Sequence, residues 1–246
     1  MILKGLTMSN ERKLFAVLID ADNISAKYAE AILREVKAYG EPALRRVYGD
    51  WSSPSLSSWK TQVVDLGLVA NQETANTKGK NASDIGLVID AMDILHAGRF
   101  DGFVLVSSDS DFTALASRLR EDGVEVIGIG ENKAPASLRN VCNRFILIEN
   151  LVDQAMEPDQ AGAADGKPKP ITQPRKLIEL IRAAMRAIEQ EDDWYRLGTI
   201  GSYIVRANPD FDPRTHGRSK LSELVAMLDP FETRKVDGNH LEIRHL

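Results

Sequence analysis

Two apolar runs end in acidic residues, and these acids are the strongest candidates for chemistry in the chain. The run 103–106 leads through two serines to Asp109 and Asp111, and the run 14–19 leads directly to Asp20. Uninterrupted aliphatic runs of this length are typical of strands buried in a parallel sheet. In open α/β sheets, ligands bind at the edge formed by the carboxyl ends of the strands. We therefore expect these carboxylates to lie together at one edge of a sheet.

A fourth acid, Asp84, opens a predicted helix. The ordinary interpretation of a first-turn acid is pairing with the helix dipole. Carboxylates held close together repel one another, however, and such clusters usually bind a cation. Mg²⁺ or Mn²⁺ prefers hard oxygen ligands and can activate water for attack on a phosphoryl group. We therefore expect Asp20, Asp84, Asp109 and Asp111 to be both metal ligands and catalytic residues in phosphodiester hydrolysis.

Polar residues close to these acids in the sequence are candidates for substrate contacts. Lys78 and Lys80 flank a glycine in a basic loop that could contact phosphate, although exposed lysines are common. Ser107 and Ser108 could orient a phosphate or cap the following helix, and the sequence leaves both open. Asn23 follows the first acid and could support the ligands or form a turn. These five residues are predicted substrate-binding residues.

Other classes of enzyme find less support in the residues. There is no Gly-x-x-x-x-Gly-Lys-Ser/Thr loop, and Gly128-Ile-Gly130 lacks the rest of a dinucleotide fingerprint. Three of the four histidines fall in the last third of the chain, so no Ser-His-Asp or Cys-His set competes well. The single cysteine, Cys142, excludes an intramolecular disulfide and a cysteine-rich zinc site. A reducing cytoplasm is the expected setting.

The elements that must position the acids alternate along the first 150 residues. Strands are predicted at 14–19, 43–48, 66–70, 103–106, 124–130 and 145–148. Helices are predicted between them, including 25–39, 84–95 and 112–122. This alternation predicts an α/β fold, a parallel sheet with helices on both faces. In the helix 84–95, the apolar stripe is predicted to consist of Ile85, Val88, Ile89, Met92 and Leu95.

A change of composition divides the chain. Residues 153–174 are rich in Pro, Gly and Ala, which predicts a linker between a domain at 1–152 and a second at 175–246. The second domain is predicted to have three helices followed by a hairpin that turns at Asp237-Gly238, as in a small winged helix-turn-helix module. With 43% hydrophobic residues and no apolar run that could span a bilayer, we expect a soluble protein. The net charge of -5 argues weakly against a protein that coats nucleic acid.

Three motifs in the first three-fifths of the chain resemble, in order, those of the NYN domain family of PIN-like nucleases, which includes LabA-like proteins. They are Ile19-Asp-Ala-Asp-Asn-Ile24, Lys78-Gly-Lys-Asn-Ala-Ser-Asp84 and Val106-Ser-Ser-Asp-Ser-Asp-Phe112. The resemblance implies a PIN-like sheet, an acidic Mg²⁺ pocket and endoribonuclease activity. It matches Asp20, Asp84 and Asp109 with the metal-binding acids, Asp111 with the fourth acid, and Asn23 with the asparagine after the first. Ser108 stands where the family usually has glycine.

The C-terminal segment resembles an OST-HTH/LOTUS domain in its Gly198–Gly201, Asn208–Asp212 and Leu221–Leu228 stretches. That resemblance implies RNA or protein binding. A basic set supports RNA, because it surrounds a turn that leads into a helix. A solvated basic face is the alternative. The set consists of Arg206, Arg214, Arg218 and Lys220, of which the last three are predicted substrate-binding residues.

Three hypotheses follow. The first is a Mg²⁺- or Mn²⁺-dependent ribonuclease whose C-terminal domain binds single-stranded or structured RNA, since tethering raises the effective concentration of substrate. The second is a non-catalytic RNA-binding or scaffold protein with a vestigial acidic pocket. The third is a phosphatase-like enzyme, for which Asp20-Ala-Asp22 has the spacing but the other parts fit less well. No membrane partner is expected, and a protein partner and a homodimer are left open.

Overall fold

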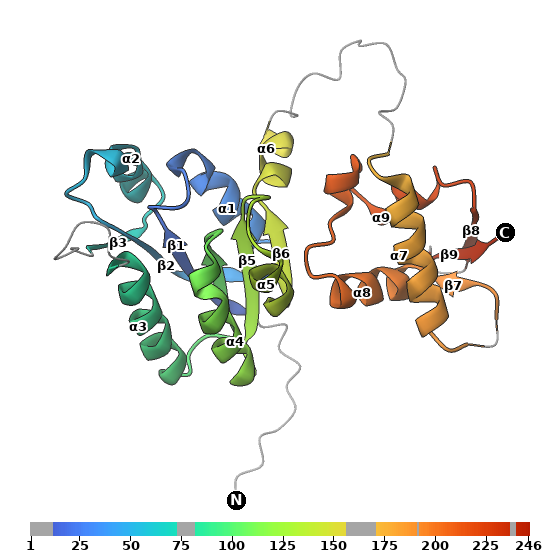
Figure 1. Ribbon diagram of the computed structural model, residues 1–246, viewed down its shortest axis with the longest axis horizontal. Coiled ribbons are helices and arrows are strands. Elements are labelled where there is room, and N and C mark those ends of the chain that lie inside the picture. Colours follow the sequence, from blue (N-terminus) through green and yellow to red (C-terminus); the bar gives the residue numbers. More distant parts are fainter. Residues whose placement is uncertain (1–11, 73–81, 156–170, 191, 237–239) are drawn as a thin grey trace, which may run out of the picture.

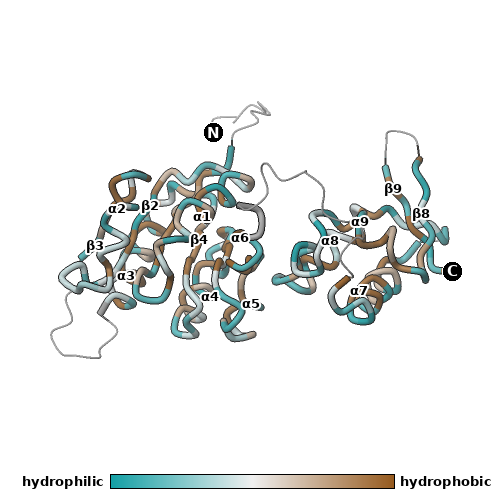
Figure 2. The backbone as a smooth tube through the Cα atoms, turned by 90° about the horizontal axis from the view of Figure 1, so that it is seen from above, coloured by the Kyte–Doolittle hydropathy of each residue, from teal (hydrophilic) through white to brown (hydrophobic). Residues whose placement is uncertain are grey.

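The computed structural model describes residues 12–72, 82–155, 171–190, 192–236 and 240–246. Within these ranges the chain forms two parts, an N-terminal part built on a parallel sheet and a C-terminal part of helices with a small antiparallel sheet (Figure 1). In both views the C-terminal part lies beside the end of the large sheet that carries α5 and α6 (Figures 1 and 2).

The six strands of the large sheet are all parallel, which confirms the predicted fold class. Their order is β3-β2-β1-β4-β5-β6, so the direction of winding reverses between β1 and β4. In such a sheet the carboxyl ends of the two central strands flank a crevice where ligands bind. The strands are β1 (Leu14–Asp20), β2 (Glu41–Gly49), β3 (Val69–Gln72), β4 (Gly102–Val106), β5 (Glu125–Gly130) and β6 (Arg144–Leu147).

Helices cover both faces of this sheet, and strand β1 shows why. Alternate side chains of a strand point to opposite faces, so Phe15 and Val17 enter one core and Ala16 and Leu18 the other. The first core lies under α1 (Ala29–Val36), α2 (Ser57–Asp65) and α6 (Glu149–Ala155). The second lies under α3 (Ala82–His96), α4 (Thr113–Glu121) and α5 (Ala136–Val141). Helix α6 was not predicted, and its Leu151 is buried in the first core.

The buried face of α3 agrees only in part with the predicted one: Val88, Met92 and Leu95 are partly buried against the core. Leu87, Ala91 and Ile94 face the core, whereas Ile85 and Ile89 are 61% and 58% exposed. Because α3 carries apolar residues around most of its circumference, periodicity alone does not determine which side packs on the sheet. The polar contacts of Asp90, described below, favour the observed orientation.

The C-terminal part encloses its own core. Helices α7 (Pro174–Ala187), α8 (Leu197–Ala207) and α9 (Leu221–Val225) pack with a sheet of order β7-β9-β8. The predicted hairpin is present as β8 (Phe231–Val236) and β9 (His240–His245), although its expected turn at Asp237-Gly238 lies outside the described residues. Tyr195–Arg196 forms β7, which pairs with β9. None of the helices in the described ranges combines the length and apolar character needed to cross a bilayer.

Candidate active site

Asp20 is the last residue of β1 and lies at the point where the strand order reverses. Its side chain is 3% exposed. One carboxylate oxygen, Oδ1, accepts hydrogen bonds from the backbone N–H groups of Asp22 and Asn23, both over 3.2 Å. The other, Oδ2, accepts a hydrogen bond from the Ser107 hydroxyl over 2.9 Å. Burial raises the pKa of Asp20 to about 6, and the charge of Asp84 adds to the increase, while the Ser107 bond opposes it.

The two serines after β4 connect the ends of neighbouring strands. Ser107 Oγ also accepts a hydrogen bond from the backbone N–H of Asp109 over 3.1 Å. The Ser108 backbone N–H donates to Asn23 Oδ1 over 3.0 Å, and Ser108 Oγ accepts from the Glu131 backbone N–H over 2.8 Å. Both serines are at least nine-tenths buried. These bonds give Asn23, Ser107 and Ser108 partners within the fold and hold the ends of β1, β4 and β5 in place.

The helix-capping alternative for the serines does not hold, because Asp109 performs that role. Asp109 Oδ1 accepts a hydrogen bond from the Asp111 backbone N–H over 3.0 Å, at the start of the 3-10 turn Ser110–Phe112. This bond keeps Asp109 and Asp111 at the start of the segment that follows β4.

Gly130 and Glu131 also support this edge, and the sequence analysis did not identify them. A side-chain Cβ at Gly130 would lie 2.6 Å from the Ser107 carbonyl oxygen. Real Cβ contacts are not this short, so glycine is required for β5 to approach the two serines. The Gly128-Ile-Gly130 pattern, dismissed above as half of a dinucleotide motif, was the available signal.

Asp84 and Asp22 act on Asp20 through their charges, and Asp109 and Asp111 act in turn on Asp84. Asp84 lies half-buried in the first turn of α3. Its pKa is raised by burial first, and then by the negative charges of Asp109, Asp111 and Asp22. Such coupling requires that the carboxylates lie near one another. The five acids therefore belong to one region at the carboxyl edge of the sheet, and Asp22 contributes charge to it.

The side chains of this region are of the type that binds a divalent cation, but they are not arranged as a coordination shell. Carboxylate oxygens are the ligands that Mg²⁺ and Mn²⁺ prefer. In the part of the chain that the structure describes, no three acidic, histidine or cysteine side chains are arranged so that they could hold a metal ion. The donor set is thus suitable, whereas a coordination shell is not formed.

Asp90 holds α3 against the sheet and is a further residue that the sequence analysis missed. It accepts hydrogen bonds from the Arg46 guanidinium and the Tyr48 hydroxyl of β2, and from Asn71 Nδ2 of β3 over 3.3 Å. Since Asp84 begins the same helix, these contacts also fix where Asp84 lies. Arg45 and Arg46, within the predicted strand 43–48, were the available signal, because a charged residue in an inner strand needs a partner.

The basic residues predicted to contact the substrate lie in different environments. Lys78 and Lys80 lie outside the described residues. Lys220 is exposed at the start of α9. Arg218 is half-buried and donates within its own domain, to the Gly217 carbonyl and to Met227 Sδ.

Arg214, a predicted substrate-binding residue, forms ion pairs within the protein. Its guanidinium donates to the carboxylates of Glu35 and Asp212, and its side chain is only 15% exposed. The sequence gives no sign of this pairing, because Glu35 belongs to α1 and lies 179 residues earlier in the chain.

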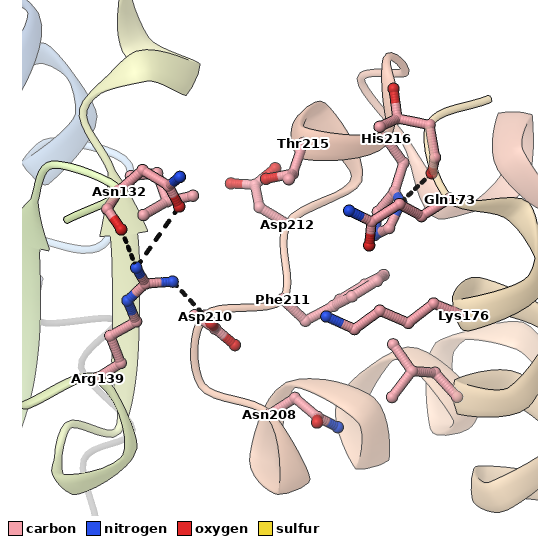
Figure 3. Close-up of a pocket in the computed structure, with 13 residues that line it drawn as sticks. Asn132, Arg139, Gln173, Lys176, Asn208, Asp210, Phe211, Asp212, Thr215 and His216 are labelled. Carbon is pink, nitrogen blue, oxygen red and sulfur yellow. Dashed lines mark hydrogen bonds and ion pairs between the residues drawn. The ribbon is translucent and has the colours of Figure 1, made fainter. Parts of the chain in front are cut away.

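A cavity lies between the two parts, away from the acids (Figure 3). Arg139 and Asn132 stand on its N-terminal side, and Lys176 and Phe211 on its C-terminal side. Asp20, Asp84 and Asp109 do not belong to its lining. The predicted catalytic residues and this cavity are therefore separate features.

Comparison with solved structures agrees with the fold. A protein of unknown function from Vibrio parahaemolyticus is similar with a TM-score of 0.50 and 19% identity, over 58% of this chain and 96% of that protein. An uncharacterized protein from Nitrosomonas europaea is 32% identical over 37% of this chain and 90% of its own, with a TM-score of 0.28. The similarity to the first protein supports the fold and says nothing of function. The TM-score of the second is too low to support a common fold. Among curated proteins, none matches the chain.

Family models match both parts. The NYN domain matches residues 14–149, and the OST-HTH/LOTUS domain matches residues 169–243. The first is a nuclease-type domain of PIN-like fold, and the second suggests RNA binding. Both matches confirm the resemblances noted in the sequence. The chain belongs to the NYN domain family and carries an OST-HTH/LOTUS domain after its NYN domain.

Proposed function

We propose that the chain is a divalent-metal-dependent endoribonuclease whose OST-HTH/LOTUS domain binds the RNA to be cut. The observation that carries the proposal is Asp20, a carboxylate that is 3% exposed at the reversal point of a NYN sheet. The negative charge of Asp84 raises the pKa of Asp20. The charges of Asp109 and Asp111 in turn raise the pKa of Asp84. Several buried or half-buried carboxylates at a ligand-binding edge require either protons or a cation. Nucleases of this family generally depend on a divalent metal.

In this proposal, Asp20, Asp84, Asp109 and Asp111 hold Mg²⁺ or Mn²⁺. When bound, such an ion activates water and stabilises the charge that develops on a phosphoryl oxygen. The chain's own contribution is orientation. Ser107 holds Oδ2 of Asp20, and the backbone of residues 22 and 23 holds Oδ1, so the carboxylate cannot rotate freely.

The basic residues would contact the phosphates. Lys78 and Lys80 precede Asp84 closely in the sequence, and Lys220 is exposed in the C-terminal domain. Contacts of this kind position the RNA without reading its sequence. The single cysteine supports a reducing cytoplasm as the setting.

A non-catalytic RNA-binding protein is the second candidate. One observation favours it, namely that no three potential ligands among the described residues form a metal-binding group. The two candidates agree on RNA binding and differ on cleavage, so a single assay separates them.

The assay uses the full chain and a 5′-labelled single-stranded RNA with Mg²⁺, Mn²⁺ or EDTA. Cleavage with either ion and none with EDTA is expected. Asp84→Asn and Asp109→Asn should each lower the rate by at least about 100-fold, as is usual for loss of a group that stabilises transition-state charge, while RNA affinity is kept. Asp93→Asn is the matched control, since Asp93 is an exposed acid on the same helix as Asp84. RNA binding without cleavage under any of these conditions would establish the second candidate.

A further inference from the structure

The segment 208–216, which follows α8, lies against the NYN domain, and we call it the docking loop. Its contacts come from its backbone and from three of its side chains, and they reach β6, α5, α1 and α6. The loop therefore meets four elements that are distant in the sequence but adjacent at one end of the sheet (Figure 1).

The docking loop contacts the edge strand of the large sheet. In the part of the chain that the structure describes, strand β6 pairs with β5 alone, so its outer side presents backbone groups to which no strand is paired. Edge strands of this kind tend to associate with other chains unless they are covered. Here the Phe145 backbone N–H donates to the Pro209 carbonyl oxygen over 2.8 Å. Beside it, Asp210 forms an ion pair with Arg139 of α5 over 3.3 Å (Figure 3).

Arg214 is the strongest single contact of the loop. Its Nη1 and Nη2 donate to the two carboxylate oxygens of Glu35 over 3.0 and 2.9 Å, an arrangement of two parallel bonds. Nε donates to Asp212 over 3.0 Å, so a carboxylate of the loop itself orients the guanidinium. The side chains of Arg214, Glu35 and Asp212 are 15%, 13% and 6% exposed. An ion pair this buried is weakened much less by salt than one at the surface.

A neutral pair completes the contact. Asn150 of α6 is 7% exposed, and its Nδ2 donates to Thr215 Oγ1 over 2.9 Å. Leaving a buried amide without a partner costs free energy, and so does leaving a buried charge unpaired. The polar groups on the two sides are matched to each other, which favours one orientation of the domains over others.

We propose that the docking loop is a dedicated interaction surface for the NYN domain, anchored by Arg214 on Glu35, so that the two domains act as one body and RNA approaches the OST-HTH/LOTUS domain elsewhere. The occupant of this face of the NYN domain is thus a segment of the same chain. Arg206 and Lys220 stay exposed and are available to phosphate. The proposal is independent of whether the acids cleave RNA.

Single-molecule energy transfer in the full chain tests this proposal. Dyes are attached at Lys60→Cys on α2 and Arg186→Cys on α7, which are both exposed positions. The native Cys142 is 1% exposed and stays unlabelled under native conditions. In this doubly labelled chain, without further substitutions, we expect one narrow distribution of the distance between the two dyes. Arg214→Glu should broaden it, because the introduced carboxylate would face the carboxylates of Glu35 and Asp212 with no guanidinium between them.

Three further variants complete the design. Arg206→Glu makes the same charge change on an exposed part of α8 and should leave the distribution narrow. Glu35→Arg combined with Arg214→Glu should restore it, because the opposite charges are exchanged. Glu35→Gln breaks the ion pair from the NYN side without changing the size of the side chain. Circular dichroism shows whether Arg214→Glu disturbs the C-terminal domain, and in that case Glu35→Gln replaces it as the test variant.

Two outcomes would overturn the proposal. One is a broad distribution in the background chain, which means that the domains are not docked. The other is an unchanged distribution in both Arg214→Glu and Glu35→Gln, whatever their affinity for RNA, because the Arg214–Glu35 pair would then not anchor the domains. If Arg214→Glu alone also binds single-stranded RNA more weakly, Arg214 is an RNA contact.

Discussion

Ser107 donates a hydrogen bond to Oδ2 of Asp20 over 2.9 Å and thereby joins the ends of the two central strands of the NYN sheet. The bond connects a residue that follows β4 to the last residue of β1. Because Asp20 is almost completely buried, this donor and two backbone N–H groups provide much of the stabilisation that its charge would otherwise receive from water.

The first prediction concerns Asp20 and pH. The pKa of Asp20 is about 6 in the folded chain and 3.8 as its reference value, so the fold binds the proton more tightly than the unfolded chain does. The ionised carboxylate therefore opposes folding above pH 6, by up to about 3 kcal/mol, and this effect disappears below pH 4. Asp20→Asn should raise the free energy of unfolding at pH 8 in EDTA and change it little at pH 4. Urea denaturation at both pH values measures this, and a loss of equal size at both would contradict it.

The second prediction concerns the donor. Ser107→Ala removes the hydroxyl that lowers the pKa of Asp20, so that pKa should rise further. It also leaves Oδ2 buried without this donor, which should cost about 1–3 kcal/mol at pH 8. The cost should be smaller at pH 4, where the carboxyl group is protonated. NMR titration of the Asp20 carboxyl carbon gives the pKa, and a lower value in Ser107→Ala than in the wild type would refute the assigned role.

The third prediction concerns metal binding. A ligand that binds only the folded chain raises its stability in proportion to the logarithm of ligand concentration above Kd. Mn²⁺ and Mg²⁺ should therefore raise the melting temperature of the wild type. Asp84→Asn and Asp109→Asn should remove this increase, whereas Asp93→Asn should keep it. Equal increases in all four proteins would place the bound ion somewhere other than the acidic edge.

The fourth prediction concerns Asp90. Asp90→Asn removes the charge that Arg46 and Tyr48 contact, and it should lower the free energy of unfolding by about 1–3 kcal/mol. Asp93→Asn, on the exposed side of the helix, should stay within about 0.5 kcal/mol of the wild type. Chemical denaturation of the two variants at pH 7.5 decides this. Indistinguishable stabilities would mean that the Asp90 contacts contribute nothing net.

The sheet and its acidic edge could be predicted because the information is local. Apolar runs end abruptly at Asp20 and before Asp109, and strands that alternate with helices lead to one parallel architecture. The identity of the family could be predicted for the same reason, since its motifs are short.

Other features depend on contacts between distant segments, which periodicity does not encode. The orientation of α3 depends on Asp90 meeting Arg46 and Tyr48 of β2, and a helix that is apolar on most sides leaves that choice open. Arg214 was predicted to contact RNA because it lies among other basic residues in the sequence. Its partner Glu35 belongs to α1 of the other domain, and only the fold brings the two together.

The most direct test of the central proposal is a crystal structure of the full chain soaked in Mn²⁺, with anomalous diffraction to locate the ion. The account predicts Mn²⁺ bound by carboxylate oxygens of Asp20, Asp84 and Asp109 at the carboxyl edge of the sheet. A structure in which no ion binds at that edge, with the three carboxylates still apart at a saturating concentration of Mn²⁺, would contradict it.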